Sequence, residues 1–185
     1  MKDKIVVVTG STSGIGFGIA SKFAKNGATL VINGLASDSE VKKLSSELKL
    51  LGAAEALFDS ADLSKPAEID RMFKNIIQKY QRVDVLVNNA GIQFVSPVEN
   101  FPPEKWEMII RIDLIAAFYT IKNVIPIMKQ QKWGRVINIA SAHALVASPF
   151  KSAYVAAKHG LIELTKSVAL EVAQDGITVN SICPG

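Results

Sequence analysis

Three side chains in the last third of the chain have the types and spacing needed for proton transfer. Tyr154 and Lys158 are four residues apart, so they share one face of a helix, and Ser141 precedes them. A free tyrosine has a pKa of about 10 and is a poor base at neutral pH. A neighbouring ammonium favours its ionised form, and a serine hydroxyl can hold the reacting oxygen. The trio therefore predicts acid–base chemistry at an alcohol or a ketone, the proton half of a hydride transfer.

A glycine-rich turn near the N-terminus is suited to holding a cofactor for that chemistry. The turn follows the apolar run 5–8 and precedes a helical stretch, and its glycines are spaced Gly, three residues, Gly, one residue, Gly. Such glycines let backbone N–H groups at a helix N-terminus approach a pyrophosphate. We expect dinucleotide phosphates to bind along this turn, at Gly10, Thr12, Ser13, Gly14, Ile15 and Gly16.

Short apolar runs alternate with longer helical stretches and must position these groups. The runs lack polar alternation, as strands buried on both faces do, and they predict strands at 5–8, 28–32, 53–58, 83–87, 136–139 and 177–182. Ser37 and Glu40 form a capping box, and Gly27 and Gly52 are placed to end helices. A single helix is expected from 103 to about 132, kinked at Pro126. The pattern predicts an α/β fold with a doubly wound, Rossmann-type parallel sheet of six strands, in one undivided domain over 1–185.

Composition narrows the class of protein. The 185 residues are 49% hydrophobic and 21% charged, with a net charge of +4 and no dense basic block, which argues against disorder and against nucleic acid. One cysteine, Cys183, and two histidines exclude an internal disulfide and provide no zinc cluster, so no metal is expected. No signal peptide or membrane span is found, and we expect a cytoplasmic protein.

Four motifs at predicted strand ends resemble those of the short-chain dehydrogenase/reductase family. Residues 9–16 resemble its TGxxxGxG fingerprint and 88–91 its NNAG motif, Asp62-Leu63 lies where the family contacts adenine, and 180–185 resembles the stretch leading to its Pro-Gly cofactor loop. The resemblance implies that Ser141 orients substrate, Tyr154 is the acid–base group, and Lys158 binds the nicotinamide ribose. It also implies cofactor contacts from Asn33, Asp62, Leu63, Asn89, Ala90, Gly91, Tyr154, Lys158, Pro184 and Gly185.

The residues after the second predicted strand bear on the choice of dinucleotide. An acidic residue there favours NAD and a basic one NADP, but this chain has Asn33-Gly34-Leu35. Ser13 also stands where NADP-dependent relatives often carry a base. Because a missing cation disfavours a 2′-phosphate, we expect NAD, with NADP left open.

Asp113 departs from the family pattern, which has an asparagine at this position. The resemblance gives that asparagine a part in holding a helix bend and a proton-relaying carbonyl. Asp113 adds a negative charge that opposes ionisation of Tyr154. The hypothesis is weaker catalysis, or a pH optimum shifted upward.

Three polar side chains near the reacting trio bear on the substrate. Gln93, His143 and Lys151 provide one cation and two hydrogen-bonding groups, which suit a small carboxylate, although a solvated lysine and a structural histidine explain them equally well. Residues 88–93, 101–106 and 137–160 resemble the matching stretches of bacterial D-3-hydroxybutyrate dehydrogenases. The resemblance implies that Gln93, His143 and Lys151, with Ser141 and Tyr154, bind the carboxylate of 3-hydroxybutyrate or acetoacetate.

The chain stops at Pro184-Gly185, where the family pattern continues. We therefore expect a C-terminally incomplete domain that lacks the family's lid and last strand and leaves the sixth strand as an edge. The resemblance also implies a homo-oligomer, a dimer or tetramer assembled through the helices after the fourth and fifth strands. Two alternatives remain open: an NADPH-dependent 3-oxoacyl reductase-like enzyme, and a non-catalytic remnant that binds dinucleotide or a partner.

Overall fold

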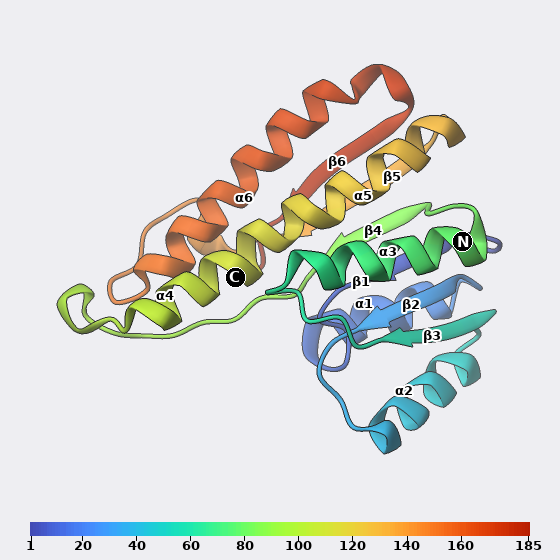
Figure 1. Ribbon diagram of the computed structural model, residues 1–185, viewed down its shortest axis with the longest axis horizontal. Helices are drawn as coiled ribbons and strands as arrows, with labels where there is room; N and C mark the ends of the chain where they lie inside the picture. Colours follow the sequence, from blue (N-terminus) through green and yellow to red (C-terminus); the bar gives the residue numbers. More distant parts are fainter.

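A parallel six-stranded sheet with helices on both faces forms the framework of the computed structural model, which describes residues 1–185 (Figure 1). Its strands are β1 (Ile5–Val8), β2 (Thr29–Asn33), β3 (Glu55–Asp59), β4 (Val85–Asn88), β5 (Gly134–Ile139) and β6 (Ile177–Ile182). The order across the sheet is β3-β2-β1-β4-β5-β6. The direction of winding reverses between β1 and β4, and ligands bind at such a switch point, beyond the carboxyl ends of the strands. The predicted Rossmann-type fold is confirmed.

Six helices connect and cover the strands. They are α1 (Gly14–Ala24), α2 (Asp38–Leu50), α3 (Pro66–Tyr80), α4 (Pro103–Ile110), α5 (Ala116–Gln131) and α6 (Ser152–Glu171). The capping box is present at the start of α2, where Ser37 N–H donates to the Glu40 carboxylate. Gly27 and Gly52 follow α1 and α2 with φ of +75° and +114°, which only glycine adopts without strain. These start and stop signals are confirmed.

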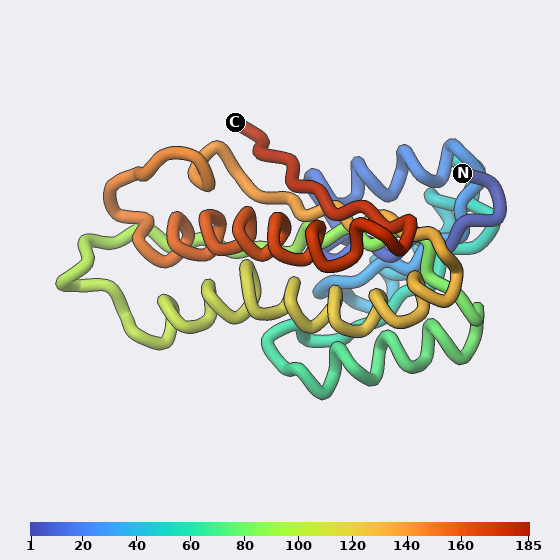
Figure 2. The backbone as a smooth tube through the Cα atoms, turned by 90° about the horizontal axis from the view of Figure 1, so that it is seen from above, coloured from blue at the N-terminus to red at the C-terminus, as the bar shows by residue number.

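Side chains of β1 explain why the strand is apolar throughout. Val7 packs into a core of 20 buried residues with α3, α5 and α6, whereas Val6 and Val8 pack into a second core of 13 residues with α1 and α2. Figure 2 shows α1 on the opposite side of the sheet from α3 and α5. Because both faces of the strand are covered, there is no polar alternation. No helix combines the length and apolar composition that a membrane span requires.

The helix expected over 103–132 is confirmed over Pro103–Gln131, but it is not α-helical throughout. A π-helical turn, Arg111–Ile115, separates α4 from α5 and contains the buried Asp113. Apolar residues continue at helical spacing through the turn, and no glycine or proline marks it, so local sequence gives no signal. Pro126 lies within α5. The bounds of β1 and β6 are as predicted, and those of the other four strands differ by one or two residues. β6 forms one edge of the sheet, pairing with β5.

Candidate active site and dinucleotide cleft

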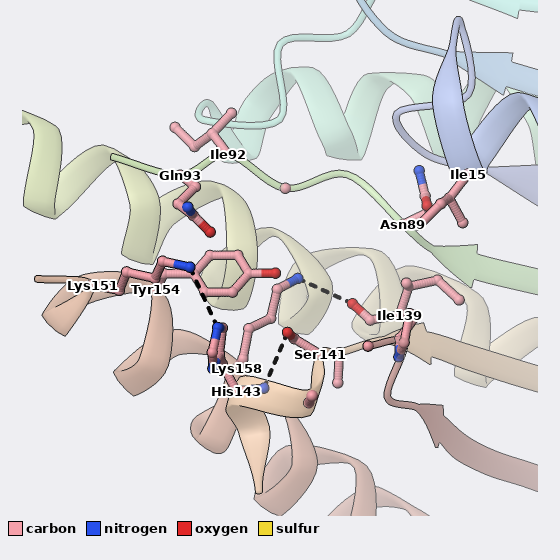
Figure 3. A pocket seen from close by; sticks show the side chains of 15 residues that line it. Ile15, Asn89, Ile92, Gln93, Ile139, Ser141, His143, Lys151, Tyr154 and Lys158 are labelled. Atoms are coloured by element: carbon pink, nitrogen blue, oxygen red, sulfur yellow. Dashed lines mark hydrogen bonds between the residues drawn. The ribbon is translucent and has the colours of Figure 1, made fainter. Parts of the chain in front are cut away.

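A pocket of about 510 Å³ opens beyond the carboxyl ends of β4 and β5 (Figure 3). It brings together the predicted proton-transfer and substrate residues from segments far apart in the sequence. The lining residues with predicted roles are Ile15, Asn89, Gly91, Gln93, Ser141, His143, Lys151, Tyr154, Lys158, Pro184 and Gly185. Ile92, Ile139, Ala140 and Ala142 complete the lining.

Lys158 is the most constrained of these side chains. Its ammonium is buried, with 3% of the residue exposed, and donates a hydrogen bond to the Ile139 carbonyl at 3.0 Å. Nζ lies 5.5 Å from the centre of the Tyr154 ring, one turn earlier on α6. The carbonyl at the end of β5 thus fixes the charge beside the tyrosine. A backbone acceptor of this kind cannot be read from residue types.

Ser141 begins a short 3₁₀ turn directly after β5 and is half-buried. Its Oγ accepts the His143 N–H at 3.1 Å, which leaves the hydroxyl hydrogen free to donate into the pocket. An oxygen held between Ser141 and Tyr154 could therefore accept from the serine while it exchanges a proton with the tyrosine.

His143 and Lys151 approach each other on the wall opposite the sheet, as the dashed line in Figure 3 marks. Lys151 Nζ lies 3.4 Å from His143 Nε2, while His143 Nδ1 is buried and has no hydrogen-bond partner. The His143 and Tyr154 ring centres are 6.4 Å apart. Gln93 lies on the exposed segment after β4. This wall offers donors and one positive charge, with no carboxylate lining the pocket.

Asp113 lies beneath the pocket, 2% exposed, and does not line it. Oδ1 accepts the Ile92 N–H at 2.8 Å. Oδ2 is 3.4 Å from Lys158 Nζ, within ion-pair distance but without the alignment of a hydrogen bond. Burial raises the pKa of the Asp113 carboxyl from 3.8 to about 6, even though the Lys158 charge and the Ile92 N–H act to lower it.

The glycine turn after β1 is tied to the segment after β4. Asn89 Nδ2 donates to the carbonyls of Thr9 and Gly10, at 3.0 and 2.8 Å. Thr9 Oγ1 accepts the N–H groups of Asn89 and Ala90. Gly16 is buried behind the turn, where a Cβ would overlap the Gly10 carbonyl and Asn89. Only glycine fits there, so the spacing seen in the sequence has a steric cause.

A second cavity of about 430 Å³ continues along this turn. Predicted cofactor residues that line it are Gly10, Thr12, Ser13, Asn33, Asp62, Leu63, Asn89, Ala90 and Gly91. Asn89, Gly91 and Ile92 line both cavities, which together form one cleft across the switch point. Gly14 and Gly16 line neither cavity.

Asp62 is the one charged side chain in the second cavity. Its Oδ1 accepts the Ser64 N–H and hydroxyl at 2.9 and 2.7 Å, and Lys65 pairs with Oδ2. The Ser64 hydrogen bonds hold the pKa of Asp62 below its ordinary value. Asn33 Nδ2 donates to the Asp59 and Ala61 carbonyls, which leaves its buried Oδ1 without a partner.

Sequence reasoning missed a buried polar network beneath the cleft. Asn88 Nδ2 donates to Asn138 Oδ1, and Asn138 Nδ2 donates to Thr165 Oγ1, at 2.9 and 2.8 Å. The Thr120 hydroxyl donates to Asn88 Oδ1, and the Ser181 and Thr165 hydroxyls are hydrogen-bonded to each other. The network fastens the ends of β4, β5 and β6 to α5 and α6. The available signal was an asparagine at the end of β4 and another within β5.

The comparisons with known proteins agree with this arrangement. The family model described as short chain dehydrogenase matches residues 4–185. The chain is 54% identical to D-beta-hydroxybutyrate dehydrogenase of Rhizobium meliloti and 50% identical to that of Cupriavidus necator. These matches cover 98% and 100% of this chain, and 70% and 71% of those proteins. A crystal structure of a metagenomic short-chain oxidoreductase in complex with NADP is 31% identical with a TM-score of 0.94, and the match covers 100% of this chain and 83% of that one. The chain therefore belongs to the short-chain dehydrogenase family, whose members are oxidoreductases.

Proposed function

We propose that the chain interconverts D-3-hydroxybutyrate and acetoacetate by hydride transfer, with NAD as cofactor. The observation that carries the proposal is the Lys151–His143 contact in the same pocket as Ser141 and Tyr154. We interpret the contact as part of an anion-binding wall, beside a group able to exchange a proton with a hydroxyl or ketone. Two relatives at 54% and 50% identity bear the name of this activity.

A nicotinamide dinucleotide fits the residues of the cleft. A side chain at Gly16 would fill the cradle of the turn, and the two cavities join through Asn89 and Gly91 into one elongated site. The turn would hold the pyrophosphate at the N-terminus of α1, and Leu63 would lie at the adenine end. When bound, the dinucleotide accepts or returns the hydride.

Tyr154 takes the hydroxyl proton during oxidation and returns it during reduction. Lys158, fixed by the Ile139 carbonyl, favours the ionised phenol and is placed to hold a ribose hydroxyl. Ser141 donates its free hydroxyl hydrogen to the reacting oxygen. Lys151 binds the carboxylate with a charge-assisted hydrogen bond, and Gln93 and His143 complete its partners. This wall fixes which carbon of the substrate faces the hydride.

The second cavity favours NAD over NADP. No lysine or arginine lines it, so a 2′-phosphate would find no counter-charge, and the nearest carboxylate belongs to Asp62. Asn33, Gly34 and Leu35 at the end of β2 bear no charge. The uncharged 2′-hydroxyl of NAD can bind in such surroundings without a counter-charge. The 2′-phosphate of NADP would lose hydration free energy on binding, and no cation would compensate for the loss.

The test is turnover of D-3-hydroxybutyrate by the purified 185-residue chain, followed by the absorbance of the reduced nicotinamide. The proposal expects reduction of NAD with the D enantiomer, little with the L enantiomer, and less with NADP. Faster reduction of a 3-oxoacyl thioester by NADPH would replace it with the reductase alternative, since such a thioester has no carboxylate for Lys151. NAD binding by calorimetry without any turnover would indicate a non-catalytic chain.

A further inference from the structure

The buried carboxylate of Asp113 stands beneath the proposed proton-transfer group without touching the pocket. The π-helical turn places it between Lys158 and the Ile92 N–H. Oδ1 is satisfied by that N–H at 2.8 Å, but Oδ2 has no hydrogen-bond partner. Its one polar neighbour is the Lys158 ammonium at 3.4 Å, so the buried carboxylate and the buried ammonium depend on each other.

Lys158 is the charged side chain that faces Asp113. On the other side of the carboxylate is a cavity of about 10 Å³, with room for at most one water molecule. No other ionisable group lines it; its remaining lining residues are Thr9, Leu63, Asn88, Ala90, Ile112, Ala116, Ala117, Thr120 and Leu161. On α6, the Tyr154 ring centre lies 5.5 Å from Lys158 Nζ, and the His143 ring centre lies 6.4 Å from that of Tyr154, whereas His159 is exposed. The segment after β4 provides only the Ile92 backbone.

We propose that Asp113 is a positioning residue that sets the charge beside Tyr154. Ionised Asp113 compensates the Lys158 ammonium and so opposes ionisation of the tyrosine. Protonated Asp113 leaves the ammonium uncompensated, so that the ammonium promotes ionisation of the tyrosine. The inference deepens the proposed function and rests on it for the meaning of the tyrosine. Its physical core, the coupling of three side chains, can be measured without substrate or cofactor. The carboxyl titrates near pH 6, so both states are accessible under mild conditions.

Removing the carboxylate charge should make Tyr154 easier to ionise. A unit charge several ångströms away in a partly buried site changes an ionisation midpoint by about one pH unit. Asp113→Asn is the suitable variant, because asparagine keeps the shape and the Oδ1 acceptor for Ile92 N–H, removes the charge, and places an amide NH2 where Oδ2 faced Lys158. Asp38→Asn makes the same chemical change at an exposed site on α2 and serves as the matched control.

The experiment is an ultraviolet titration of phenolate formation in the free protein. The chain has three tyrosines. Subtracting the curve of Tyr154→Phe, recorded in the same background, isolates Tyr154 from Tyr80 and Tyr119. The proposal expects the ionisation midpoint of Tyr154 to fall by about one pH unit in Asp113→Asn and to equal the wild-type midpoint in Asp38→Asn. An unchanged midpoint in a folded Asp113→Asn would overturn it.

A second measurement keeps the proposal testable if Asp113→Asn fails to fold. Carbon-13 NMR follows the Asp113 carboxyl in the wild-type chain and in Lys158→Met, where its cation is lost. The coupling predicts a midpoint about one pH unit higher in Lys158→Met. Equal midpoints would refute the coupling.

Kinetics then link the coupling to turnover. For oxidation on the acid limb, where the ionised tyrosine limits the rate, Asp113→Asn should raise kcat up to about tenfold, matching a one-unit midpoint change, and leave KM nearly unchanged. A change in KM alone would contradict the proposed role. Absence of turnover in every variant, with the Tyr154 midpoint shifted as expected, would contradict the proposed function and leave the coupling standing.

Discussion

Relative to the wild type, Asp113→Asn should be more stable at neutral pH than in acid, on top of a pH-independent cost from the lost Lys158 ion pair. Burial raises the pKa of the Asp113 carboxyl from 3.8 to about 6, so the folded state holds this proton more tightly than the unfolded chain. The contribution of the protonated carboxyl is fully present below about pH 4 and is lost as the pH rises through about 6. The difference between the unfolded and folded pKa values corresponds to about 3 kcal/mol of folding free energy. The asparagine variant does not lose this free energy as the pH rises, because its amide does not ionise.

Urea unfolding of both proteins at about pH 4 and about pH 8 measures this effect. The free energy of unfolding of the variant, minus that of the wild type, should be about 3 kcal/mol larger at the higher pH than at the lower. Any change in packing, or in the Lys158 contact itself, that does not depend on pH cancels in this comparison. Equal differences at the two pH values would refute the assignment of a raised pKa to this buried carboxyl.

Three further substitutions test other parts of the account. Lys151→Met should lower kcat/KM for D-3-hydroxybutyrate about 10- to 100-fold, as loss of a charge-assisted hydrogen bond implies, and should spare the methyl ester; equal losses in steady-state kinetics would argue against carboxylate binding. Gly16→Ala should weaken NAD binding in calorimetry, because its Cβ overlaps the turn. Gly18→Ala, in open space on α1, should add about 0.5–1 kcal/mol to the free energy of unfolding. Equal NAD affinity and equal stability in the two variants would exclude the steric argument. Phe150→Gly should raise the unfolding free energy by about 1 kcal/mol in urea, since Phe150 has a φ of +64°, and a decrease would mean that this backbone is not strained.

The sheet could be predicted from sequence because its strands are buried on both faces. Val6, Val7 and Val8 enter two different cores, so the strand is a continuous apolar run that local reading recognises. The resemblance associated a helix bend with position 113, but residue spacing does not show the π-helical turn, because apolar residues continue through it. What distinguishes the turn is a tertiary contact, the Asp113 carboxylate accepting the Ile92 N–H.

The site was predictable to the extent that side-chain type determines it. Ser141, Tyr154 and Lys158 meet in one pocket, as their spacing and order along the strands indicated. The Ile139 carbonyl that fixes Lys158 has no signature in residue type. The Asp113–Lys158 contact joins residues 45 positions apart and depends on how α6 packs on the π-helical turn. Spacing identified Lys158 and the family resemblance identified Asp113, but neither gave their contact.

The central claim is that Tyr154 exchanges the proton of the reacting oxygen, and its replacement by phenylalanine tests that most directly. Tyr154→Phe should lower the rate of NAD reduction by D-3-hydroxybutyrate about 10²- to 10⁴-fold, while NAD binding stays measurable by calorimetry. Tyr119→Phe, the same loss of a hydroxyl on α5 away from the pocket, should retain the wild-type rate. A Tyr154→Phe protein that turns over as fast as the wild type would contradict the account.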